Sequence, residues 1–416
     1  MKRQSVALFL ETSSGYSRGL LRGITAYVRD CANWSVVLIE VERGSLPPNW
    51  LRTWNGDGII ARIETRNVAE FFRGIQIPLI DLSETRYVKE AVWSQTDDAA
   101  IAALAAAHFI ERRYGNIAFC GDPGFAWSRN RQERFADVVG TEGFQYFAFE
   151  ATHRYADGFS WDDESNRMRE WLQRLPKPVG IFCCYDFLAR QVLDVCLNSK
   201  LRVPEAVAVL GVDDDALICE LADPPLSSVT LDTHAAGYRA AELLHEIMRS
   251  GDADSKINKQ ANKLGRQTRE IGAGTDVPST LEAPLVVRPL GVRLRESTDT
   301  VAIPDAEVAK ALTFIRENAT SNIFIEDVLA STSLSRRVFE YRFKKFVGRS
   351  PHDEIQRLRL NLAKRLLAGG NLPVGEIARR AGFKHGEYLT SVFRRSQGMT
   401  PTQFRRVMNR ESSIRD

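Results

Sequence analysis

The chain has 416 residues, of which 44% are hydrophobic and 26% are charged, and its formal net charge is +3. These values are typical of folded globular proteins and exclude collagen-like, coiled-coil and wholly disordered chains, and the length predicts two or three domains. No apolar run reaches the roughly 20 residues that cross a bilayer, and the run from Val6 to Leu10 is too short for a signal-peptide core. We therefore expect a cytoplasmic protein without a membrane segment.

The cysteines show no metal-binding or disulfide pattern. The six of them form no C-x-x-C pair, and no histidine stands at zinc-finger spacing. Cys183 and Cys184 are adjacent within an apolar run, which is typical of small core residues. We expect reduced thiols, no metal and no cofactor.

The charge is divided unevenly along the chain. From Asp305 to the end, 21 lysines and arginines face 12 acidic residues, whereas the first 304 residues hold 35 basic and 41 acidic residues. A basic tail on an acidic body indicates a polyanion partner, because neutralising phosphates releases counterions. A merely solvated basic face is the alternative.

The first 250 residues alternate between predicted strands and helices. Helical apolar spacing is found in segments such as Leu20 to Val28 and Ala99 to Ile110. Such alternation predicts parallel sheets covered by helices, and its length suits two similar lobes with a cleft between them. The predicted strands are Val6 to Glu11, Trp34 to Val41, Gly58 to Arg62, Ile77 to Leu82, Asn116 to Gly121, Phe144 to Glu150, Val179 to Tyr185 and Val207 to Val212.

Polar residues follow these strands at the edge where parallel sheets bind ligands. Carboxylates and guanidinium groups converging there suit a polyhydroxylated ligand, and aromatic rings offer a face to its C–H side. We therefore predict a sugar site, although Asp97, Asp186 and Asp213 taken singly also fit helix N-caps. The strand-end residues are Glu11, Tyr16, Arg18, Arg62, Asp81, Trp127, Arg131, Asp186, Asp213, Asp214 and Asp215.

Five motifs in order carry a resemblance to a known family. They are Thr96-Asp97-Asp98, Trp127-Ser128-Arg129-Asn130-Arg131, Cys184-Tyr185-Asp186, Leu210-Gly211-Val212-Asp213-Asp214 and Pro225-Leu226-Ser227-Ser228-Val229. Together they resemble the effector core of lactose- and galactose-repressor-type regulators, a two-lobed α/β fold related to periplasmic sugar-binding proteins.

That resemblance implies specific site residues. In the family, residues matching Arg131, Asp186 and Asp213 bind sugar hydroxyls, and Tyr16, Arg18 and Trp127 are added as sugar contacts. The effector domain is expected at residues 1–298. Residues 250–282 are polar and glycine-rich and should form an exposed insertion.

The tail contains an approximate helical repeat. The first unit has a helix from Ile325 to Ala330 and a second from Ser335 to Val347, with Phe339, Phe343 and Phe346 inward. The second unit repeats this from Val374 to Ala381 and from His385 to Gln397, with Leu389 and Phe393 inward, and a helix from Pro351 to Leu367 joins the units. Two such units can enter successive major grooves of DNA. A protein-docking bundle is the alternative.

The details resemble the arabinose-regulator type of DNA-binding domain, which we assign to residues 305–410. The motifs include Gly348-x-Ser350-Pro351, Glu376-Ile377-Ala378-x3-Gly382-Phe383 and Gly398-x-Thr400-Pro401. Ser333 stands where that family has a turn glycine, which is expected to strain or reshape the turn. The resemblance implies base readers at Arg337, Glu340, Tyr341, His385, Glu387 and Ser391, and phosphate contacts from Lys344, Lys345, Arg394 and Arg395.

A sugar-repressor core fused to such a tail resembles the D-xylose operon regulator family over nearly the whole length. This resemblance implies a non-enzymatic, sugar-responsive transcription factor that binds operator DNA as a homodimer. It also implies a pentose such as D-xylose as effector and RNA polymerase as a further partner. Glu11 stands where that family usually has a smaller amide side chain, which weakens the inference that xylose is the ligand. The alternative is a sugar-converting α/β enzyme with an appended interaction domain.

Overall fold

The computed structural model describes residues 3–154, 158–250, 284–299, 303, 305–321, 323–368 and 372–407. The chain divides into two compact units, Met1–Asp299 and Thr300–Asp416, and each is described by itself. The predicted insertion at 250–282 lies outside the described residues, except for Ser250 at the end of a helix. Within the described part of the chain, no helix is both long and apolar enough to cross a membrane.

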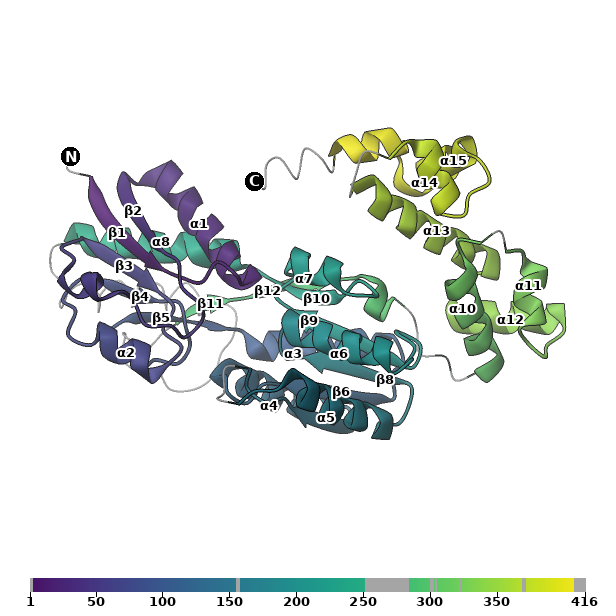
Figure 1. Cartoon of the computed structure of the whole chain (residues 1–416), viewed down its shortest axis with the longest axis horizontal. Coiled ribbons are helices and arrows are strands. Elements are labelled where there is room, and N and C mark those ends of the chain that lie inside the picture. The colour runs from purple at the N-terminus through teal and green to yellow at the C-terminus, as the bar shows by residue number, and fades with distance from the viewer. Residues whose placement is uncertain are drawn as a thin grey trace. The chain divides into compact units, whose positions relative to one another are not determined.

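The first unit consists of two lobes, each built on a six-stranded sheet with helices packed against it (Figure 1). The strand orders are β11-β5-β4-β3-β1-β2 in the first lobe and β12-β10-β9-β8-β6-β7 in the second, and only the pairing of β12 with β10 is antiparallel. The strands of the first sheet are β1 (Gln4–Phe9), β2 (Trp34–Ile39), β3 (Gly58–Ala61), β4 (Leu79–Asp81), β5 (Val92–Thr96) and β11 (Leu285–Val287). Those of the second sheet are β6 (Asn116–Gly121), β7 (Gln145–Glu150), β8 (Val179–Cys183), β9 (Val207–Val212), β10 (Ser227–Leu231) and β12 (Pro289–Arg293).

Helices cover the sheets, so the central strands are buried along their whole length. Every residue of β8 and β9 is buried, which explains their continuous apolar sequences. The helices of the first lobe are α1 (Gly15–Cys31), α2 (Arg66–Phe72) and α8 (Thr233–Ser250). Those of the second lobe are α3 (Asp98–Glu111), α4 (Ala126–Thr141), α5 (Trp161–Arg174), α6 (Asp186–Asn198) and α7 (Ala216–Leu221).

Helices α1 and α8 pack with their backbones in close approach. A Cβ atom added at Gly23 of α1 would lie 2.0 Å from the carbonyl oxygen of His234 in α8, and one at Gly237 would lie 2.0 Å from the carbonyl oxygen of Leu20. Only glycine fits such contacts between backbones. This packing fixes the start of α1, which carries residues of the site.

The two-lobed α/β fold predicted from the sequence is confirmed, and each of the eight predicted strand runs contains a strand. Strands β5 and β10 were not predicted. Near the end of the first unit, Glu296–Thr298 form a short 3-10 helix. Buried hydroxyl groups, rather than the backbone hydrogen bonds of a strand, connect this helix to the second sheet. Ser297 Oγ donates to Val209 O at 2.6 Å, and Thr298 Oγ1 donates to Ser227 Oγ at 2.8 Å.

Within the described residues, the chain passes between the lobes three times. It crosses after β5, after β10 and between β11 and β12, and Figure 1 shows the last of these crossings. Backbone hydrogen bonds join the crossings: Asp97 N donates to Val287 O at 3.0 Å, and Asp232 N donates to Arg288 O at 2.9 Å.

The second unit is helical, with two small cores. One core includes Phe339 and Phe343, the other Leu389 and Phe393, as predicted, whereas Phe346 is only half-buried. The helix α10, which precedes both repeats, was not predicted. The helices are α10 (Ala306–Asn318), α11 (Ile325–Ala330), α12 (Arg336–Val347), α13 (Pro351–Ala368), α14 (Val374–Arg380) and α15 (Gly386–Gln397).

The turn between α11 and α12 is unstrained, contrary to the expectation for Ser333. Ser333 has no positive φ. Its backbone N and its Oγ both donate to Oε2 of Glu307 in α10, at 2.6 and 2.8 Å. A side chain from α10 therefore holds this turn.

Candidate functional site

A cavity of about 260 Å³ lies between the two lobes of the first unit. Side chains from the carboxyl ends of strands in both sheets line it, which is where parallel sheets bind ligands. Its size is at the small end of ligand cavities. Five of the six residues predicted to bind sugar line it: Tyr16, Trp127, Arg131, Asp186 and Asp213.

Arg18 is the exception among the predicted sugar contacts. It does not line the cavity. Its Nη2 instead donates to both carboxylate oxygens of Asp215 at 2.8 Å, and its Nη1 donates to Thr12 O at 2.8 Å. Arg18 lies on α1 and Asp215 caps the start of α7, so this ion pair connects the two lobes beside the cavity.

Arg131 is fixed by contacts on the inner face of α4. Its Nε donates to Asp98 Oδ1 at 2.9 Å, its Nη1 donates to Cys184 O at 2.5 Å, and the side chain is buried. The face of Trp127 lies 5.4 Å from its guanidinium carbon. These contacts hold the planar donor group at one place in the cavity wall.

Asp186 is buried at the first turn of α6. Its carboxylate accepts hydrogen bonds from Ser228 Oγ at 2.5 Å and from the backbone N of Asp215 at 2.8 Å. Burial and the neighbouring charge of Asp213 raise its pKa well above the usual range. Asp186 therefore organises the loop after β9 as well as lining the cavity.

Asp213 is the acceptor that the protein leaves most available. It follows β9 with a φ of 106°, a conformation that side chains rarely adopt and that is often found at functional sites. Within the described part of the chain, no hydrogen bond reaches its carboxylate, and burial raises its pKa to about 6 against the lowering effect of Arg131. A strained, unbonded carboxylate in a cavity is suited to accept hydroxyl donors from a ligand.

Other residues of the wall were not predicted as sugar contacts. Arg43, Glu64, Glu84 and Tyr185 line the cavity, as do Glu11 and Arg62 from the strand-end set. Burial raises the pKa of Glu84 to about 7, and its Oε1 accepts a hydrogen bond from Asn130 of the other lobe at 3.0 Å. Arg43 lies in the loop after β2, and its guanidinium carbon is 4.5 Å from the ring centre of Phe125 in the other lobe.

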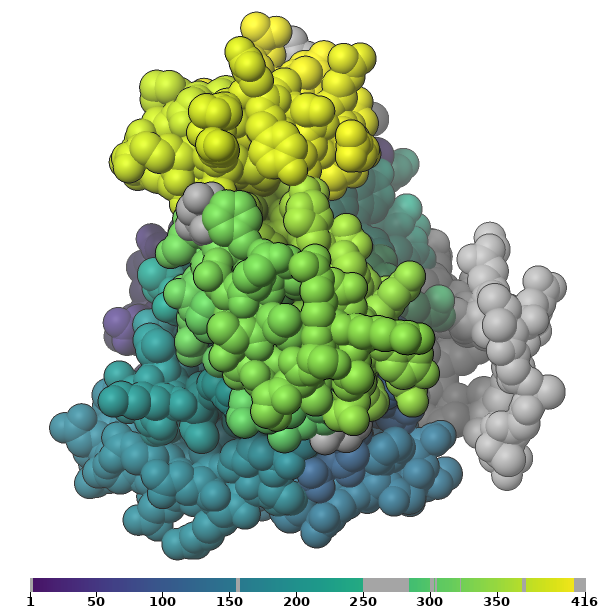
Figure 2. Space-filling model, turned by 90° about the vertical axis from the view of Figure 1, so that its right-hand side faces the viewer, coloured from purple at the N-terminus to yellow at the C-terminus, as the bar shows by residue number. Residues whose placement is uncertain are grey.

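The tail presents a second site. On α12, Arg337, Glu340, Tyr341, Lys344 and Lys345 are all exposed, and Tyr341 is 67% exposed. The carboxylate of Glu340 accepts from Arg336 Nε at 3.0 Å, so this predicted base reader lies in a surface ion pair. In Figure 2 the first half of the tail is green and the second half is yellow. Residues from both halves line a groove of about 660 Å³.

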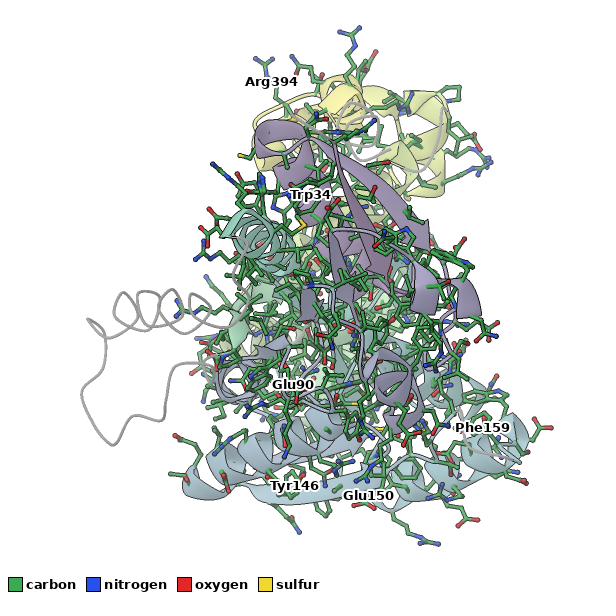
Figure 3. The ribbon with its side chains drawn as sticks, turned by 90° about the vertical axis from the view of Figure 1, so that its left-hand side faces the viewer. Trp34, Glu90, Tyr146, Glu150, Phe159 and Arg394 are labelled. Carbon is green, nitrogen blue, oxygen red and sulfur yellow. The ribbon has the colours of Figure 1, made fainter. Side chains whose placement is uncertain are left out.

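The second repeat brings its predicted contacts together. His385, Glu387, Ser391, Arg394 and Arg395 all line one shallow hollow of about 990 Å³ on α15. Figure 3 shows Arg394 projecting away from the surface of the tail. An exposed helix of this kind, with basic residues on its outer face, suits a DNA groove.

Family comparisons cover both units. Residues 88–265 match a periplasmic binding protein-like domain, residues 328–407 match a helix-turn-helix domain, and residues 5–101 match the XylR N-terminal domain. The cellobiose complex of the regulator CelR shares 20% identity over 71% of this chain and 85% of its own, with a TM-score of 0.52, and supports the fold alone.

Whole-length relatives are found as well. The xylose operon regulatory protein of Escherichia coli K12 is 28% identical over 98% of both chains, and that of Haemophilus influenzae is 28% identical over 96% of this chain and 97% of its own. A structure titled xylose-binding transcription activator xylR is 27% identical, covers 98% of this chain and 99% of its own, and has a TM-score of 0.75.

The fold and these relatives define a transcription regulator with a helix-turn-helix DNA-binding domain, rather than an enzyme. More closely, the chain is similar over almost its whole length to the xylose operon regulatory proteins.

Proposed function

We propose that this regulator responds to D-xylose or a closely related pentose bound between its lobes, and that it activates transcription. The observation that carries the proposal is the cavity, where Arg131 and Asp213 from different elements face one small space. The names of the whole-length relatives support a pentose. A donor and an acceptor with fixed positions suit a sugar with several hydroxyls.

Each predicted contact has a distinct role in this proposal. Asp213 accepts hydrogen bonds from a pair of hydroxyls, Arg131 donates to others, and Asp186 orders the loop that carries Asp213. Trp127 and Tyr16 cover the C–H faces of the ring. Arg18 acts indirectly, through its ion pair with Asp215, rather than by touching the sugar.

The effector domain at residues 1–298 and the DNA-binding domain at 305–410 are proposed to act in a cytoplasmic homodimer. Arg337, Tyr341 and His385 read bases together with Glu340, Glu387 and Ser391. Lys344, Lys345, Arg394 and Arg395 contact phosphates, and RNA polymerase is the proposed partner in activation. Basic side chains on the exposed faces of α12 and α15 support this arrangement.

Coupling between the domains is proposed to start at the end of the first unit. Arg295 Nη2 donates to Asp214 Oδ1 at 2.7 Å, next to the sugar ligand candidate Asp213. Ser297 and Thr298 are bonded to β9 and β10, as described above. A sugar that fixes the loop after β9 therefore acts on the residues from which the chain continues to the tail. The sugar shifts the equilibrium only by its differential affinity for two states, typically about 1–3 kcal/mol.

The test measures DNA binding with and without sugar. The full-length protein first selects duplexes from a randomised pool in D-xylose, and anisotropy titrations of the selected duplex then compare D-xylose, L-arabinose, D-ribose and no sugar. We expect D-xylose to strengthen binding about fivefold or more. Equal affinity and an equal footprint in all four conditions would refute the sugar response, and absence of duplex selection would refute the DNA assignment.

A further inference from the structure

Four charged side chains of the first lobe form one ion-pair network in the cavity wall. Arg62 Nη1 donates to Glu11 Oε1 at 2.6 Å, and its Nη2 donates to Glu64 Oε1 at 3.0 Å. Arg43 bonds both oxygens of Glu64, through Nε at 2.5 Å and Nη2 at 3.1 Å, and its Nε lies 3.7 Å from Glu11. The four side chains are only 6–13% exposed, and their formal charges cancel.

The charge of Glu64 in this network is fixed at neutral pH. Burial acts to raise the pKa of Glu64, but Arg43 and Arg62 hold it at about 2, so this carboxylate is ionised. Each arginine directs two nitrogens to carboxylates of the protein, while Nε of Arg62 is buried without a hydrogen-bond partner. Two aromatic rings confine the guanidinium groups further: Arg62 lies 4.8 Å from the centre of Tyr16, and Arg43 lies over Phe125.

Of the other arginines in the wall, Arg131 is also opposed by a carboxylate. Arg131 is paired with Asp98 at 2.9 Å, and Arg154 lies 4.0 Å from the ring centre of Phe187 and has further partners. The carboxylates of Asp213 and Glu84 also face the cavity. An anionic ligand would therefore meet carboxylates while most guanidinium nitrogens of Arg43, Arg62 and Arg131 are already bonded, and like charges in a buried site repel strongly.

We propose that Glu11 and Glu64 are specificity-determining residues that restrict the cavity to uncharged carbohydrates and exclude the corresponding sugar acids. This inference rests on the proposed function, because it presumes that the cavity holds a carbohydrate. Without the Glu11 charge, the acceptor of Arg62 Nη1 at 2.6 Å is no longer an anion and the network carries a net positive charge. The cavity then accepts a carboxylate ligand.

The experiment compares three ligands by calorimetric titration of the full chain. D-xylose is the aldose, D-xylonate is its acid, and xylitol is an uncharged open-chain control for the shape of the acid. The variants are Glu11→Gln and Glu64→Gln, which keep the side-chain shape and remove the charge. The matched control is Glu90→Gln, since Glu90 is exposed and does not line the cavity.

We expect the wild-type chain and the Glu90 variant to bind D-xylonate more weakly than xylitol. In Glu11→Gln, the affinity for D-xylonate relative to xylitol should rise by about tenfold or more, since a close charge pair is worth at least the corresponding free energy. Glu64→Gln should shift the ratio in the same direction, and it decides the question if the Glu11 variant does not fold.

Tight binding of D-xylonate by the wild-type chain would overturn the inference. An unchanged ratio in the folded variants would overturn it as well, while D-xylose binding and the sugar response of DNA binding would leave the proposed function standing. If no uncharged aldose binds the wild-type chain, the proposed function fails and this inference fails with it.

Discussion

Nη2 of Arg18 lies 2.8 Å from both carboxylate oxygens of Asp215, and the pair joins helix α1 of one lobe to the first turn of α7 in the other. Arg18 is 28% exposed and Asp215 only 8% exposed, so water screens this ion pair partly. The contact stabilises the arrangement in which the lobes enclose the cavity.

Replacing Arg18 by alanine should therefore weaken sugar binding without removing a direct contact to the sugar. We expect a loss of about 1 kcal/mol, or about fivefold in affinity, because the pair is partly screened. Calorimetric titration measures the affinity, and small-angle scattering reports the opening of the lobes. Arg22→Ala, an exposed change on the same helix, is the control. An unaltered affinity in Arg18→Ala would contradict a closing role for the pair.

Sugar binding should depend on pH through Asp213. Burial raises its pKa to about 6, and the positive charges of Arg131, Arg62 and Arg43 limit that rise. The ionised form accepts hydroxyl donors, so affinity should be full above pH 7 and decline as the pH falls below 6, approaching about tenfold per pH unit. Asp213→Asn should bind weakly and show a flatter profile between pH 5 and 7. A wild-type profile identical to that of the variant would exclude Asp213 as the titrating contact.

Asp81 should affect the stability of the folded protein rather than sugar binding. Its Oδ1 accepts from the backbone N of Ile63 and of Ser83, at 3.1 and 3.0 Å, while burial raises its pKa to about 8. A buried acid with a raised pKa is protonated in the fold, so its cost to stability grows as the pH rises from about 4 to 8.

The variant Asp81→Asn keeps an acceptor oxygen for both backbone groups and removes the titration. The difference in free energy of unfolding, variant minus wild type, should increase by about 1–3 kcal/mol from pH 5 to pH 8. Urea unfolding of the first unit, followed by tryptophan fluorescence, measures this difference. A difference that is constant with pH would show that Asp81 does not titrate in this range.

The two kinds of proposed DNA contact should respond differently to mutation. Arg337→Ala should cost about 1–3 kcal/mol on the selected duplex and relax specificity at one base pair, as loss of a base contact does. Lys345→Ala should weaken binding to all duplexes alike and lower the slope of log affinity against log salt by about one. Anisotropy titrations at several salt concentrations separate the two. A salt-slope change without a specificity change in Arg337→Ala would reassign Arg337 to the phosphates.

Glu307 should position the first recognition helix although it touches no DNA in the proposal. Its Oε2 accepts from the backbone and hydroxyl of Ser333, and hydrogen bonds from Lys310 and Ser333 lower its pKa to about 2. Glu307→Ala should weaken operator binding a few-fold and leave sugar affinity unchanged. Glu317→Ala, an exposed change on the same helix, is the control, and equal operator affinity in both variants would remove the positioning role.

Much of the sheet architecture could be predicted because buried parallel strands have continuous apolar sequences. Strand β9 is of this kind. Strands β5 and β10, with the sequences VWSQT and SSVTL, are not, because polar side chains interrupt them. In β10 these side chains are satisfied by specific neighbours. Ser228, for example, donates to Asp186, a contact 42 residues away along the chain that no local pattern reveals.

The cavity could be predicted only where a side chain follows a strand directly. Arg131 and Asp213 belong to motifs and line it, whereas Arg18 turned out to be committed to Asp215, which spacing along α1 does not disclose. Arg43 comes from a loop, and its place depends on Glu64 and Phe125 from separate segments. Its position two residues beyond the predicted strand Trp34 to Val41 was the available signal.

The three crossings between the lobes limit how those lobes can move. Because hydrogen bonds connect Asp97 to Val287 and Asp232 to Arg288, the crossings form one narrow band of backbone. Sliding one lobe across the other would strain all three peptides of that band at once, whereas bending changes a few torsion angles in each. The lobes thus retain one soft degree of freedom, and under the proposed function different sugars would differ in their effect through the bend angle that each one stabilises.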